Sequence, residues 1–150
     1  MNDAAMIAAG AIACLSLSAV GSAVGTGLAA ASAVGSWKKC YAANRPAPFT
    51  LLTFVGLPLS QTLYGMILMF VMIGKASIAG AGIPLLVLGM FAGVGIGLSA
   101  MFQGRAAAAA CDAQAETGQG LANYVIALGV VETVAIFVMV FTIIALGKVA

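Results

Sequence analysis

Apolar residues fall into four long runs along the chain, and most of the polar residues lie in the short stretches between them. The runs cover residues of about 4–36, 49–73, 82–103 and 121–146. An α-helix needs roughly 20 apolar residues to cross a hydrocarbon core about 30 Å thick, and each run is that long. The pattern therefore predicts an all-α membrane protein with four transmembrane helices.

The stretches between the runs predict where the helices end. Pro46 and Pro48 lack a backbone N–H group and disfavour helix before them, so a polar loop is expected over residues 37–48. A very short link around residues 74–75 joins the second and third runs. After the third run, the alanine-rich residues 105–116 are predicted to extend that helix into water.

The two halves of the chain resemble each other. Two pairs of segments align, 24–31 with 101–108 and 57–62 with 128–133. The sequence therefore predicts two duplicated helical hairpins, over residues 1–75 and 76–150. Because two spans separate the copies, the repeats are expected to be parallel rather than inverted.

The first and third runs are rich in small residues, whereas the second and fourth carry Phe, Met, Leu and Ile. Gly21 and Gly25, and likewise Gly89, Gly93 and Gly97, are spaced by four residues and share a helix face that another backbone can approach closely. This spacing also occurs in the ordinary packing of membrane helices. Thin inner helices and bulky outer ones are what a tightly curved ring needs, so we expect identical chains to form a homo-oligomeric ring.

Composition excludes several classes of function. Of the 150 residues, 63% are hydrophobic and 7% are charged, against about 25% charged in soluble domains. The chain has no histidine, which excludes a zinc-hydrolase or histidine-based active site, and a net charge of +2 does not indicate a nucleic-acid partner. Its three cysteines form no CxxC pair, so neither a disulfide framework nor a structural metal site is predicted.

The length of the first run and the positions of the basic residues indicate how the chain crosses the membrane. The first run is about twice too long for a signal peptide and has no basic residue before it, so a retained span is expected. The loops after the first and third spans hold four basic residues and the opposite side holds two, namely Lys38, Lys39, Arg45 and Arg105 against Lys75 and Lys148. This bias favours a multi-pass cell-membrane protein with its long loops cytoplasmic and both termini outside.

One acid lies deep inside a span. Glu132 is about 11 residues into the fourth run, roughly 17 Å from its start. An ionised carboxylate in hydrocarbon costs several kcal/mol, so such acids normally mark an ion or proton pathway. Gln61 holds the equivalent place in the second run, at a similar depth. The alternative is a structural role, in which a protonated Glu only supports helix association.

Other polar groups lie near this level. Tyr64 shares a helix face with Gln61 and with the carbonyl of Leu57, and Ser60 lies beside them. Pro58 is expected to bend the helix and free backbone oxygen near Leu57, although a simple packing kink is the alternative.

Gln103 is the remaining deep polar residue, on the third span. It lies about 20 residues from the start of its span, whereas Glu132 lies about 15 from the corresponding end of the fourth. At 1.5 Å per residue the two depths differ by roughly 8 Å, so contact requires the third helix to begin beyond the bilayer face.

Together these groups offer one negative charge and several neutral oxygens. Hard cations prefer oxygen ligands, and one carboxylate cancels the charge of a monovalent cation. The set therefore predicts a site for a small hard monovalent cation around Glu132. The Tyr64 hydroxyl either holds the Glu132 carboxylate in a closed position or only anchors in a protein interface. Binding of H⁺ alone would need only a carboxyl group with a raised pKa.

These residues resemble one family. The segments 57–65, 102–104 and 131–133 are similar to the K (proteolipid) subunit of prokaryotic V-type ATPases, most closely its sodium-translocating branch, and the likeness covers essentially the whole chain. In that branch a Leu carbonyl, a Thr hydroxyl, two Gln side chains and a Glu hold the ion, and a Tyr bonds the Glu. The resemblance therefore implies a Na⁺ site in this chain with Tyr64 closing it, formed by Glu132, Gln61, Gln103, Ser60 and the Leu57 carbonyl. Ser60 stands where the family has Thr, which preserves the hydroxyl, and Leu59 stands where Gly is expected.

The resemblance implies a rotary mechanism. It implies a non-catalytic ring subunit that carries Na⁺ in an ATP-driven machine and hydrolyses no ATP itself. Its expected partners are identical subunits, a membrane stator subunit that supplies an Arg, a central-stalk subunit on the cytoplasmic loops, and the lipid bilayer. A rotor carrying H⁺, a small proton-coupled secondary transporter and a structural bundle with no transport role are the alternatives.

Overall fold

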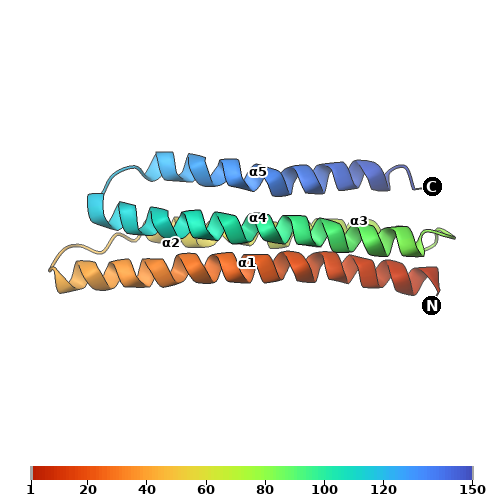
Figure 1. Cartoon of the computed structure of the whole chain (residues 1–150), viewed down its shortest axis with the longest axis horizontal. Helices are drawn as coiled ribbons and strands as arrows, with labels where there is room; N and C mark the ends of the chain where they lie inside the picture. Colours follow the sequence, from red (N-terminus) through yellow and green to blue (C-terminus); the bar gives the residue numbers. More distant parts are fainter. Residues whose placement is uncertain (1, 150) are drawn as a thin grey trace.

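The computed structural model describes residues 2–149, and within that range it is helical with no strand. Its elements are α1 (Asp3–Ala42), α2 (Leu51–Gly56), the 3₁₀ turn η1 (Leu57–Leu59), α3 (Ser60–Ile73), α4 (Gly82–Thr117) and α5 (Leu121–Leu146). The stretches Asp3–Ala42, Leu51–Ile73, Gly82–Thr117 and Leu121–Leu146 are each long and apolar enough to cross a membrane. They lie side by side in an elongated bundle, and α1 begins at the end where α5 finishes (Figure 1).

The observed helices match three predicted runs closely and lengthen the first. The fourth run coincides with α5, the second forms Leu51–Ile73, and the alanine-rich extension of the third continues to Thr117. The loop expected from residue 37 is wrong at its start, because α1 remains helical through Ala42. Residues 37–42 contain no Pro or Gly, and beside them α4 is extended by its alanine-rich turns, which give α1 a surface to pack on.

Helices α1 and α4 run parallel and form the most extensive contact in the bundle. A Cβ added at Gly21 would overlap the backbone of Gly97, and one added at Gly104 would overlap that of Gly25. Farther along, the Ser32 hydroxyl donates to the Ala108 carbonyl at 2.6 Å. The small-residue faces therefore let two backbones touch, as their spacing predicted. Duplication of the hairpins and assembly into a ring stay predictions.

The second span changes its helical geometry at Pro58. Proline has no N–H to donate, and the chain forms the three-residue turn η1 there instead of α-helix. The Leu57 carbonyl accepts the Ser60 backbone N–H, which closes this tighter turn. The chain therefore departs from α-helix at Pro58, directly before Ser60 and Gln61 at the start of α3, and the bend expected there stays a prediction.

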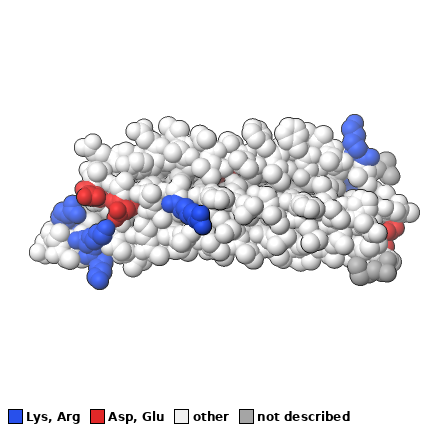
Figure 2. Space-filling view, viewed as in Figure 1, with Lys and Arg blue, Asp and Glu red and all other residues white. Residues whose placement is uncertain are grey.

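Charge and exposure agree with a membrane environment. Most of the charged side chains in Figure 2 lie at the two ends of the bundle, and one basic side chain lies farther in from the left end. Large apolar side chains on α5 are exposed, among them Val130 at 64%, Phe137 at 60% and Phe141 at 65%. An apolar surface of this extent is stable only against lipid or another chain. The protein is therefore a helical membrane protein.

Candidate functional site

Glu132 lies near the middle of α5 and is partly buried against two other helices. Its Oε1 accepts a hydrogen bond from the Tyr64 hydroxyl at 2.6 Å, and its Oε2 accepts one from Gln103 Nε2 at 3.2 Å. Tyr64 comes from α3 and Gln103 from α4. The carboxyl group is therefore held from two sides by donors on separate helices.

The two glutamines form the buried centre of the site. Both side chains are 0% exposed, and Gln61 Nε2 donates to Gln103 Oε1 at 2.7 Å. Gln103 Nε2 also donates to the Leu128 carbonyl at 3.1 Å, which lies one helical turn before Glu132 on α5. Gln103 therefore joins α3, α4 and α5 through its single amide.

Ser60 connects this centre to the turn at Pro58. Its Oγ lies 2.9 Å from the Leu57 carbonyl oxygen, to which it donates, and 3.2 Å from Gln61 Oε1. The hydroxyl therefore sits between two acceptor oxygens. Because η1 sets the direction in which the Leu57 carbonyl points, the proline-induced turn shapes this side of the site.

All of the predicted site residues except Pro58 belong to one hydrogen-bonded group. Glu132 contacts Tyr64 and Gln103 directly, whereas Gln61 is linked to it through Gln103. The Ser60 hydroxyl is hydrogen-bonded to Gln61, and it also donates to the Leu57 carbonyl. Pro58 is buried in the turn and makes no polar contribution of its own.

Gln103 reaches Glu132 although the two residues lie at different distances from their helix ends. Gln103 is 21 residues from the start of α4 at Gly82, whereas Glu132 is 14 residues from the end of α5 at Leu146, so α4 extends past α5 at this end of the bundle. Counting from helix ends therefore gives no common depth for residues on the two helices. The contacts of Gln103 with Leu128 and Glu132 set the true register.

Sequence reasoning missed two contributors near the carboxylate. The Leu128 carbonyl accepts from Gln103, and the Ser99 hydroxyl donates to the Val131 carbonyl at 3.1 Å. Leu128 is four residues before Glu132, so the shared helix face was the available signal. By contrast Thr133, beside Glu132, is exposed and its hydroxyl donates to Val130 on its own helix.

The electrostatics of the site are those of a single carboxyl group. Among residues 2–149, the one salt bridge is Lys39–Asp112, far from Glu132 along the helices. No group of three or more His, Cys, Asp or Glu side chains gathers in that range. One negative charge among neutral amide, hydroxyl and carbonyl groups is suited to one proton or one monovalent cation, and not to a multiply charged metal ion.

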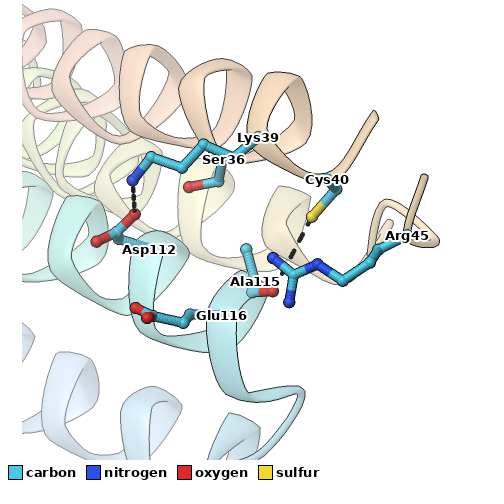
Figure 3. A pocket seen from close by; sticks show the side chains of 7 residues that line it. All are labelled: Ser36, Lys39, Cys40, Arg45, Asp112, Ala115 and Glu116. Carbon is cyan, nitrogen blue, oxygen red and sulfur yellow. Dashed lines mark hydrogen bonds and ion pairs between the residues drawn. The ribbon is translucent and has the colours of Figure 1, made fainter. Parts of the chain in front are cut away.

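A polar cavity of about 130 Å³ lies between α1 and α4 at the loop end of the bundle, which is the end where these two helices finish (Figure 3). Lys39 and Arg45 line it together with Asp112 and Glu116, and Lys39 Nζ lies 2.9 Å from Asp112 Oδ1. Two positive and two negative side chains leave the cavity with no net charge. Its charges therefore favour no class of ionic ligand.

Comparisons with protein-family models and with curated proteins find no match to this chain. What the fold and the site define by themselves is a class: a helical membrane protein with four candidate spans and one intramembrane carboxyl group enclosed by uncharged polar side chains.

The central position of Gln103 leads to a prediction on stability. Replacing Gln103 by Leu removes the partner of the buried Gln61 amide and a partner of Glu132 Oε2. Unpaired buried polar groups cost about 1–3 kcal/mol each, so the free energy of unfolding is expected to fall by roughly 2 kcal/mol or more. Denaturation in detergent measures it. Thr133→Val is the control, since that hydroxyl bonds only within its own helix, and an equal loss in the two variants would contradict the prediction.

Proposed function

We propose that the chain is a rotor-ring subunit of a prokaryotic V-type ATPase that binds Na⁺ and carries it across the membrane during ATP-driven rotation. The observation that supports this most is the group of oxygen-bearing side chains joined to Glu132. A carboxylate, two amides and a hydroxyl from three helices meet with a backbone carbonyl at one level of the bundle. A structural bundle has no need of so many buried polar groups, each of which costs free energy in an apolar interior.

The oxygens suit a small hard cation. Ser60 Oγ lies within hydrogen-bond distance of both Leu57 O and Gln61 Oε1, and Gln103 Oε1 lies 2.7 Å from the nitrogen of the same Gln61 amide. Na⁺ at this place takes over the acceptor oxygens that the internal donors now use. The carboxylate of Glu132 cancels its charge, so that the loaded site crosses the bilayer as a neutral unit.

Tyr64 acts on the Glu132 carboxylate and not as a ligand of the ion. Its hydroxyl donates to Glu132 at 2.6 Å, and a hydrogen bond to an ionised acceptor is short and strong. This bond holds the carboxylate against the bundle. Breaking it would release Glu132 toward a neighbouring protein surface, where a stator Arg displaces the ion.

The fold is also suited to a ring. Thin helices α1 and α4 pack together, while α3 and α5 lie against them on the side that carries Glu132 and its partners. In our proposal α1 and α4 form the inner layer of a ring of identical chains, and the stator subunit meets α5. The long loops are cytoplasmic and contact a central stalk, and both termini lie outside the cell membrane. This chain hydrolyses no ATP.

Carbodiimide labelling of Glu132 tests the proposal, because the reagent attacks the protonated carboxyl group and bound Na⁺ excludes the proton. At slightly acidic pH, Na⁺ at millimolar or lower concentration is expected to slow the labelling, whereas K⁺ at the same ionic strength is not. A labelling rate that does not depend on Na⁺ would favour the H⁺-carrying rotor. Native mass spectrometry after gentle extraction adds the assembly state: a large closed ring supports the rotor, and a dimer favours the secondary transporter.

A further inference from the structure

A buried hydroxyl on α1 faces the ion site without a hydrogen-bond partner of its own. Ser22 is 1% exposed, and its Oγ makes no hydrogen bond within the part of the chain that the structure describes. A buried hydroxyl normally finds a partner, because leaving one unpaired costs free energy. The two nearby polar residues on this helix differ: the Ser18 and Thr26 hydroxyls each donate to a carbonyl four residues earlier.

The packing of α1 on the second span places Ser22 opposite Gln61. A Cβ built on Gly65 would lie 2.6 Å from the Ser18 Oγ, and one built on Gly25 would lie 3.0 Å from Pro58 Cβ. The two helices are therefore antiparallel, with residue 18 level with 65 and residue 25 level with 58. Ser22 stands between Ser18 and Gly25 on α1, as Gln61 stands between Pro58 and Gly65 on its helix.

Gln61 has a hydrogen-bonding group left for such a partner. Its Nε2 donates to Gln103, and a side-chain amide carries a second N–H. Its Oε1 lies 3.2 Å from the Ser60 hydroxyl. When that oxygen turns to a cation, the amide rotates as a planar unit and needs an acceptor for its N–H groups on the α1 side, where Ser22 lies.

We propose that Ser22 is a positioning residue of the ion site, whose hydroxyl accepts from the Gln61 amide and keeps its carbonyl oxygen facing the bound cation. This inference rests on the proposed function and extends it to α1, which otherwise provides no group to the site. Ser22 touches no ion itself. It acts through Gln61.

The test compares Ser22→Ala with Ser18→Ala in the full-length protein. For both, the Na⁺ concentration that halves carbodiimide labelling of Glu132 is measured. Loss of one neutral hydrogen bond is expected to raise this concentration about fivefold in Ser22→Ala. Ser18→Ala is the matched control, because Ser18 is equally buried but bonds only to Cys14 of its own helix, and it is expected to match the wild type.

Two further measurements distinguish a positioning role of Ser22 from a structural one. Without Na⁺, the unfolding temperature of Ser22→Ala is expected to equal or exceed that of the wild type, because the variant removes an unpaired buried hydroxyl. The pH profile of Na⁺-free labelling should also stay unchanged, since Tyr64 and Gln103 are the groups that touch Glu132. A lower unfolding temperature or a shifted profile would overturn the inference in favour of a packing role.

The outcomes keep the two proposals apart. If Na⁺ protects the wild type and Ser22→Ala equally, the Ser22 inference fails and the proposed function stands. If Na⁺ protects neither protein, the sodium-carrying function fails, and the role of Ser22 fails with it.

Discussion

Replacing Glu132 by Gln is expected to abolish saturable Na⁺ binding, with a loss of affinity on the order of 100-fold or more. The substitution keeps the size of the side chain and an oxygen that can accept from Tyr64 at its present 2.6 Å. It removes the only charge at the site. Taking away one partner of a buried ion pair costs about 3–5 kcal/mol, since the remaining charge is left without compensation. Equilibrium binding of radioactive Na⁺ to the purified protein measures the change.

A charge elsewhere on the chain supplies the control for this variant. Asp112→Asn has the same chemistry, but Asp112 forms an exposed pair with Lys39 at the loop end of the bundle. Exposed pairs contribute little, so this variant should bind Na⁺ as the wild type does. Retained binding in Glu132→Gln would contradict the assignment of the carboxylate as the ion's counter-charge.

Gly104→Ala is expected to lower the free energy of unfolding as much as any single methyl addition to the bundle. The added Cβ would overlap the backbone of Gly25 on α1, and backbone cannot move aside as a flexible side chain can. Forcing extra atoms into a close-packed contact costs typically about 1–3 kcal/mol and occasionally more, and this site is expected to lie at the upper end. Unfolding in detergent, followed by helix content, measures the loss.

The matched control is Gly27→Ala, also a helix-interior glycine. A Cβ there meets no atom within 4 Å, so the substitution only exchanges Gly for a better helix former. That exchange is expected to stabilise the helix by about 0.5–1 kcal/mol. Equal effects of the two substitutions would mean that α1 and α4 do not pack through the glycine faces.

The sequence was most informative where periodicity and chemistry coincide. Four runs of apolar residues predicted the four long helices, because length and hydropathy alone decide whether a segment suits a membrane. Glu132 and Gln61 stood out for the same reason, since polar groups are costly at that depth. The glycine spacing indicated a close helix contact, but only the structure identifies α1 and α4 as the two helices involved.

What the sequence could not settle is the register between helices. The contact of Gln103 with Glu132 was uncertain, because helix ends need not lie at a common level. The Leu128 carbonyl shares a helix face with Glu132, but only the structure shows that Gln103 donates to it. Ser22 was one small residue among many on α1, and only its burial together with the positions of Gly65 and Pro58 sets it apart.

The most direct test is the number of Na⁺ ions that the purified protein binds at equilibrium. A lone carboxylate surrounded by neutral oxygens holds one monovalent cation, so binding should saturate at one Na⁺ per chain. Binding that does not saturate, or that leaves the protein free of Na⁺ at millimolar concentration and neutral pH, would contradict the account.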